Sequence, residues 1–139
     1  MRRLELYQAD SPGYHPLLIR KGWQVAILNS DQAQHYSAIT HIDVHFKTDE
    51  AFVLLEGAVH LITAEIEENQ CRFFVEKMQY GVVYNVPKNT WHNISMEKGS
   101  KVIIVENDNT HIDDFDFHHF TEEDKLALAA AVESAEQLI

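Results

Sequence analysis

The sequence predicts an all-β fold, a sandwich or barrel of antiparallel strands, followed by one α-helix near the C-terminal end. Eight short runs rich in β-branched and aromatic residues follow one another between residues 23 and 107. Turn-forming residues separate these runs at short, regular intervals, as in antiparallel sandwiches and barrels. From residue 121 the composition changes to alanine-rich, which favours a helix.

Length and composition fit one folded domain. A chain of 139 residues, 45% of them hydrophobic, can bury a core without a disulfide or a structural metal. The turns are too short to link separate domains, and we find no internal repeat. We therefore expect a single domain over residues 1–139, with a core barrel at about 23–107 and a C-terminal arm and helix at about 108–139.

The predicted strands follow the apolar runs and end at turn residues such as Asn29-Ser30-Asp31 and Lys98-Gly99-Ser100. They cover residues 23–29, 37–46, 51–57, 58–66, 71–77, 81–87, 91–97 and 101–107. Two apolar segments nearer the N-terminus, residues 4–8 and 15–20, are further candidate strands.

The C-terminal helix is expected to begin after Thr121, because a hydroxyl N-cap is followed there by three acidic residues that suit a helix N-terminus. It should run for about four turns. The preceding residues 107–120 are predicted to form a loop or arm that leads to the helix. The predicted apolar face of the helix consists of Leu126, Ala129, Ala130 and Val132.

The charge balance excludes some classes of partner. With 11 Lys and Arg against 22 Asp and Glu, the formal net charge is −11, which opposes binding to nucleic acid or to an anionic membrane. The first ten residues lack the apolar region of a signal peptide, and no stretch is long enough for a membrane-spanning helix, so we expect a cytoplasmic protein. Cys71 is the only cysteine, which rules out an intramolecular disulfide.

A polar stripe lies along the predicted strand 37–46. Alternate residues of a strand share a face, which places His41, Asp43 and His45 together. The stripe could simply meet water on a half-exposed strand. His92, on another predicted strand, favours a functional interpretation of the stripe. His45, Glu50 and His92 together supply two imidazole nitrogens and a carboxylate, a set suited to a divalent transition metal.

Residues 43–57 resemble the latter part of the first conserved motif of the cupin superfamily. Here Asp43-x-His45 is followed by four residues, Glu50, six residues and Gly57. Asp43 stands where many cupins have the first metal-binding histidine. The glycine that opens the motif is replaced by Ser37.

Residues 81–96 are similar to the second cupin motif. The pattern reads Gly81, five residues, Pro87-x-Asn89, two residues, His92, three residues and Met96. Asn89 replaces a turn glycine, which is acceptable because asparagine tolerates a left-handed conformation. Met96 replaces a terminal asparagine, so a polar contact could be lost there.

The resemblance implies a double-stranded β-helix, the cupin jelly-roll barrel, with a site inside the barrel mouth. It also implies a divalent metal, Mn, Fe or Zn, held by Asp43, His45, Glu50 and His92. Two carboxyl groups in one confined cavity repel each other unless a proton or a cation is present, which favours the metal. Glu50 and Tyr84 are the candidate catalytic residues.

Two further histidines, His41 and His60, are considered as possible members of the same predicted site. His41 lies on the same predicted face as Asp43 and could act as a substitute ligand or hydrogen-bond to one. His60 could line the same cavity, although a buried structural histidine is the more common case.

Three functions stay open at this point. The first is a metal-dependent enzyme, of isomerase or oxygenase type, that acts on a small polar metabolite such as a sugar derivative or an organic acid. The second is a non-catalytic module that binds or senses a small molecule, and the third is a metal-free isomerase or epimerase. Small cupins commonly form dimers, so we expect a homodimer to which residues 4–8 and 15–20 contribute.

Overall fold

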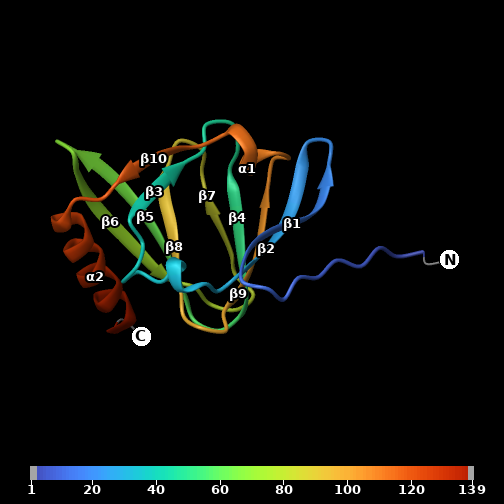
Figure 1. Ribbon diagram of the computed structural model, residues 1–139, viewed down its shortest axis with the longest axis horizontal. Coiled ribbons are helices and arrows are strands. Elements are labelled where there is room, and N and C mark those ends of the chain that lie inside the picture. The colour runs from blue at the N-terminus through green and yellow to red at the C-terminus, as the bar shows by residue number, and fades with distance from the viewer. Residues whose placement is uncertain (1–2, 138–139) are drawn as a thin grey trace.

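Figure 1 shows the computed structural model, which describes residues 3–137. The described residues form two five-stranded sheets, with the strand orders β1-β2-β9-β4-β7 and β10-β3-β8-β5-β6. Neighbouring strands pair antiparallel in both sheets. The strands are β1 Gly13–Arg20, β2 Trp23–Asn29, β3 His41–Val44, β4 Glu50–Glu56, β5 Val59–Glu67, β6 Gln70–Lys77, β7 Val83–Val86, β8 Trp91–Met96, β9 Lys101–Glu106 and β10 Asp116–His119.

The main core lies between the two sheets. In the first sheet, Phe52 of β4 pairs with Ile104 of β9, and both side chains are buried in this core. The next residues along these strands, Val53 and Ile103, pair with each other and are only half-buried. This alternation is expected for strands with one face in the core, and it leaves the outer face of the first sheet lined by apolar side chains.

The C-terminal helix α2, Glu122–Gln137, contacts strand β6 and lies at one side of the molecule next to the second sheet (Figure 1). A separate core cluster joins Ile39 and Ile62 to Leu128 and Val132 of the helix. The predicted apolar face was partly wrong, because Leu126 is 74% exposed. The residues that the helix buries are instead spaced three and four apart, the period of one helix face: Asp124, Leu128, Val132 and Ala135.

The predicted elements agree with the structure in most places. Strand β2 coincides with the predicted run 23–29, and residues 15–20 lie within β1. The run 37–46 was too long, since only His41–Val44 is a strand, and residues 4–8 form none. None of the helices in the described part of the chain is long and apolar enough to cross a membrane.

The segment 107–120 was wrongly predicted as a loop. It contains the short helix α1, Thr110–Asp113, and the strand β10, which pairs with β3. Phe115 and Phe117 alternate with Asp114 and Asp116 there, a period-2 pattern that fits an edge strand.

Two turn residues fix the ends of the strands that carry the site. Gly57 has a φ of +86°, and an added Cβ atom would lie 2.3 Å from Ser100 Oγ, so no larger residue fits there. Asn89 has a φ of 65°, as expected for asparagine in place of a turn glycine. The backbone amide of Asn89 donates to the carbonyl of His45 at 2.7 Å, which joins the two motifs.

Candidate functional site

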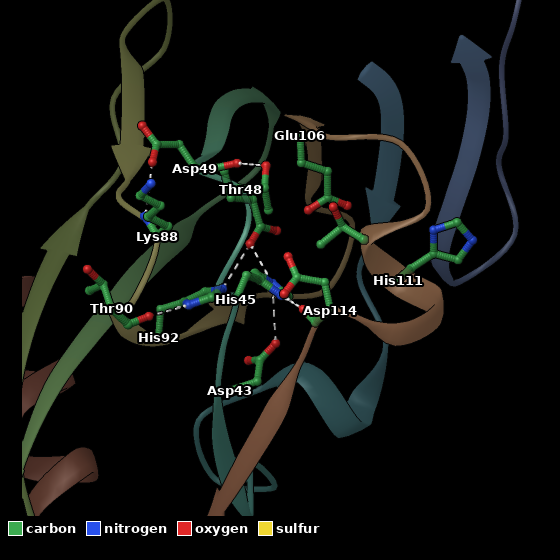
Figure 2. A network of polar contacts seen from close by, with 12 residues as sticks. Asp43, His45, Thr48, Asp49, Lys88, Thr90, His92, Glu106, His111 and Asp114 are labelled. Carbon is green, nitrogen blue, oxygen red and sulfur yellow. Dashed lines mark hydrogen bonds and ion pairs between the residues drawn. The ribbon is translucent and has the colours of Figure 1, made fainter. Parts of the chain in front are cut away.

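Four side chains converge inside the barrel, and we call them the histidine cluster: Asp43, His45, Glu50 and His92. Glu50 Oε2 is 3.0 Å from His45 Nε2 and 2.9 Å from His92 Nε2. Asp43 Oδ2 is 3.7 Å from His45 Nε2. The residues come from β3, the turn after it, β4 and β8, so both sheets contribute (Figure 2).

Backbone carbonyls orient both histidine rings. His45 Nδ1 donates to the carbonyl of Asp114 at 2.6 Å, and His92 Nδ1 donates to the carbonyl of Thr90 at 2.9 Å. Each ring therefore turns its Nε2 atom toward Glu50. This is the arrangement of metal-binding histidines, in which the second nitrogen is held by a carbonyl or carboxylate.

Asp114 holds His45 in a second way. Its carboxylate accepts hydrogen bonds from the backbone amides of Phe46 and Lys47, at 3.0 and 3.1 Å. The segment that precedes β10 is thus tied to the turn that carries His45. This role could not be predicted from the sequence, because Asp114 lies 69 positions away from His45.

Glu50 and the two histidines of the cluster shift each other's pKa values. Burial by itself would raise the pKa of Glu50, but hydrogen bonds from His45 and His92 outweigh it and lower the pKa to about 2. Burial would lower the pKa of His45, whereas its contact with Glu50 raises it to about 9. The pKa of His92 is raised by the same contact against the effect of burial. Without a bound cation, protonated histidines are needed to balance the carboxylate.

A second acid, Glu106, lies beside Glu50. The two residues are paired across β4 and β9, and an oxygen of Glu106 lies within 4.8 Å of ligand atoms of His45 and Glu50. Burial and the charge of Glu50 raise the pKa of Glu106 to about 7.

Glu106 belongs to a set of polar contacts that we call the Glu106 network: Tyr14, Gln24, Glu106 and His111. The Tyr14 hydroxyl donates to Glu106 Oε1. Gln24 Nε2 donates to the same oxygen at 3.1 Å and lies 3.1 Å from His111 Nδ1. Glu106 of β9 and His111 of α1 lie to one side of the histidine cluster (Figure 2).

The histidine cluster and three members of the Glu106 network, Tyr14, Glu106 and His111, line one cavity of about 280 Å³, a size that suits a small ligand. Phe52, Phe115 and Phe117 supply apolar wall. Of the residues in the second group, Tyr14, Glu106 and His111 were not predicted as site residues. Tyr14 and Glu106 are positioned by the pairing of β1 and β9 with other strands, and His111 lies on the helix α1.

The cavity does not include every predicted candidate. Tyr84, a candidate catalytic residue, does not line it; its hydroxyl accepts a hydrogen bond from the amide of Gln79, and its ring packs on the main core. His41 also does not line this cavity, since its ring packs against Phe117 with centroids 4.7 Å apart. His60 faces the helix instead, with Nε2 at 2.7 Å from Glu136.

No family model matches the chain, and neither does any curated protein. Solved structures do match. BH2720 from Bacillus halodurans is 18% identical over 88% of this chain and 86% of its own, with a TM-score of 0.56. A Streptomyces PAC13 structure with uridine is 10% identical over 86% of this chain and 96% of its own, with a TM-score of 0.55.

A third match is an RmlC-like cupin protein from Desulfovibrio desulfuricans, 15% identical over 77% of this chain and 96% of its own, with a TM-score of 0.49. Two antiparallel five-stranded sheets that enclose a cavity define a double-stranded β-helix. The chain has the jelly-roll fold with a C-terminal helix that the sequence predicted. At these identities the likeness concerns the fold.

Proposed function

We propose that this protein binds a divalent metal ion through His45, Glu50 and His92, with Asp43 as a further ligand, and binds or transforms a small molecule beside it. The orientation of the two histidines supports this most directly. Both Nδ1 atoms are occupied by carbonyls, and both Nε2 atoms approach one carboxylate oxygen at 2.9–3.0 Å. Neutral rings would turn two lone pairs toward that oxygen, and a cation would relieve the repulsion.

The donor set fits such an ion. Imidazole nitrogen and carboxylate oxygen suit Mn, Fe or Zn, and a site with two histidines and carboxylates leaves room for further ligands. When bound, the metal would act as a Lewis acid on an oxygen of the small molecule. The carbonyls of Asp114 and Thr90 would keep the two rings in place, while Phe115 and Phe117 form the apolar wall.

The test is elemental analysis of the purified, untagged protein beside the variant His45→Ala/His92→Ala. We expect close to one equivalent of Mn, Fe or Zn in the native protein and none in the variant. The variant His15→Ala/His35→Ala is the matched control, since it also removes two histidines but neither lines the cavity. It should keep the metal. Absence of metal from the native protein, even after reconstitution, would refute the proposal.

We also propose that the chain forms a homodimer through the outer face of the first sheet. Half-buried or exposed apolar side chains cover that face and no helix of the described residues packs on it, unlike the outer face of the second sheet, which α2 covers. An apolar patch of this kind typically marks an interface. Sedimentation should show a dimer that the substitution Ile103→Glu converts to a monomer; a monomeric native protein would contradict this.

A further inference from the structure

Glu106 has a buried oxygen that no residue satisfies. The residue is 6% exposed. Its Oε1 accepts hydrogen bonds from Tyr14 and Gln24, whereas Oε2 has no hydrogen-bond partner among the described residues. A buried polar atom without a partner is unfavourable and therefore unusual in a stable protein. Since Glu106 lines the cavity, a small rotation of its side chain would bring this buried oxygen to a hydroxyl group of a ligand bound there.

The charged residues of the cavity disfavour anionic ligands. Three carboxyl groups line it, those of Asp43, Glu50 and Glu106, and no Lys or Arg is among the described residues of the lining. A ligand carboxylate or phosphate would therefore lie near these acids, and His45 and His92, the lining residues that balance the charge of Glu50, already contact that carboxylate. Like charges at short distance in a buried site repel strongly.

The apolar wall indicates the rest of the ligand. Phe115 and Phe117 stack on each other with ring centroids 5.2 Å apart, and they remain 39% and 44% exposed although both line the cavity. Aromatic side chains that stay exposed beside a cavity offer a surface on which the apolar face of a ring can pack. The volume of about 280 Å³ limits the ligand to a small one.

We propose that Glu106 accepts a hydrogen bond from a hydroxyl group of an uncharged, ring-containing ligand, and that the cavity thereby selects such a molecule over an organic acid of the same size. Tyr14 and Gln24 hold the Glu106 carboxylate in position from Oε1. The inference rests on the proposed function only in that it concerns the same cavity.

The test compares ligands that differ in one group. Benzyl alcohol and benzoate share a ring and nearly the same size, and glucose and gluconate form a second pair. Binding of each is measured by NMR titration of the native protein at about pH 8, where the carboxyl group of Glu106, whose pKa is about 7, is ionised. We expect the alcohol of at least one pair to bind about tenfold more tightly than its acid, and in Glu106→Gln this preference should fall to about threefold or less, as for loss of a charged hydrogen-bond acceptor. The pair that shows the preference identifies an aryl alcohol or a sugar as the ligand class.

Control variants keep the result interpretable. Glu76 is an exposed acid on β6, so Glu76→Gln should retain the full preference. Acids that bind as tightly as their alcohols, or the failure of both alcohols to bind, would overturn the proposal. Loss of metal from Glu106→Gln would also overturn it, because Glu106 would then be a metal ligand. If the native protein holds no metal, the proposed function fails, and the same titrations still test Glu106.

Discussion

The histidine cluster and the Glu106 network lie next to each other, and each is built around a buried glutamate. Glu50 receives hydrogen bonds from two histidines, and its pKa falls to about 2. Glu106, its neighbour across β4 and β9, receives hydrogen bonds from the neutral groups Tyr14 and Gln24, and its pKa rises to about 7. Both residues are well buried. Burial raises the pKa of both glutamates. At Glu50 the contacts with His45 and His92 outweigh it, whereas at Glu106 the hydrogen bonds from Tyr14 and Gln24 do not outweigh burial and the charge of Glu50.

The most severe way to remove this difference is Glu50→Gln. The substitution keeps the size of the side chain and removes the charge that holds His45 and His92 together. We expect metal affinity to fall by more than about 100-fold, since a direct ligand should matter more than the outer contacts that orient one. Competition with a chelating dye measures this. An unchanged affinity would show that Glu50 is not a ligand.

A smaller loss is expected when only the orientation of His45 is disturbed. Asp114→Ala removes the carboxylate that ties the turn at Phe46 and Lys47 to the segment before β10. Metal affinity should fall roughly 10- to 100-fold, the range for such supporting contacts. The adjacent substitution Asp113→Ala is the control, because that residue is exposed. Equal effects of the two substitutions in the dye assay would contradict this explanation.

In the Glu106 network, the raised pKa of Glu106 predicts that stability depends on pH. The pKa of Glu106 is raised from 4.5 to about 7 in the folded protein, so the folded state holds a proton that the unfolded state has lost between these values. The contribution of Glu106 to the stability of the metal-free protein should therefore fall as pH rises from about 4.5 to 7. In Glu106→Gln this contribution is absent, and the fall should be smaller by roughly 1–2 kcal/mol. Urea unfolding near pH 5 and pH 7.5 measures it; parallel curves for both proteins would count against the raised pKa.

The smallest effect is expected from Tyr14→Phe. This change removes one hydrogen bond to Glu106 Oε1 and leaves the donor Gln24 in place. We expect a loss of about 1 kcal/mol in the free energy of unfolding and no change in metal content. A reduced metal content in this variant would mean that the Glu106 network takes part in metal binding.

The sequence predicted the histidine cluster better than the Glu106 network, for a physical reason. Asp43, His45 and Glu50 lie within eight positions, on β3, the turn after it and the start of β4, and the motif spacing was enough to predict that they come together. Glu106 faces Glu50 because of the register between β4 and β9, which spacing along the chain does not determine. The same reason applies to Tyr84, which does not line the cavity, because alternation along β7 does not determine its pairing with β4.

The fold could be predicted further than the site. The eight runs and the helix signal were sufficient for an all-β architecture, whereas β10 was missed because it is four residues long and is stabilised mainly by its pairing with β3. Metal binding, the homodimer and a cytoplasmic location stay predictions.

The contact between Asp114 and His45 has a consequence for the order of events during synthesis. A nascent chain that has emerged as far as His92 already contains all four members of the histidine cluster, yet it lacks the carbonyl that orients His45. At about 5–20 residues per second, that carbonyl follows a second or more later. We therefore expect tight metal uptake to come after the barrel has closed, so that the ion stabilises a finished protein and does not direct its folding.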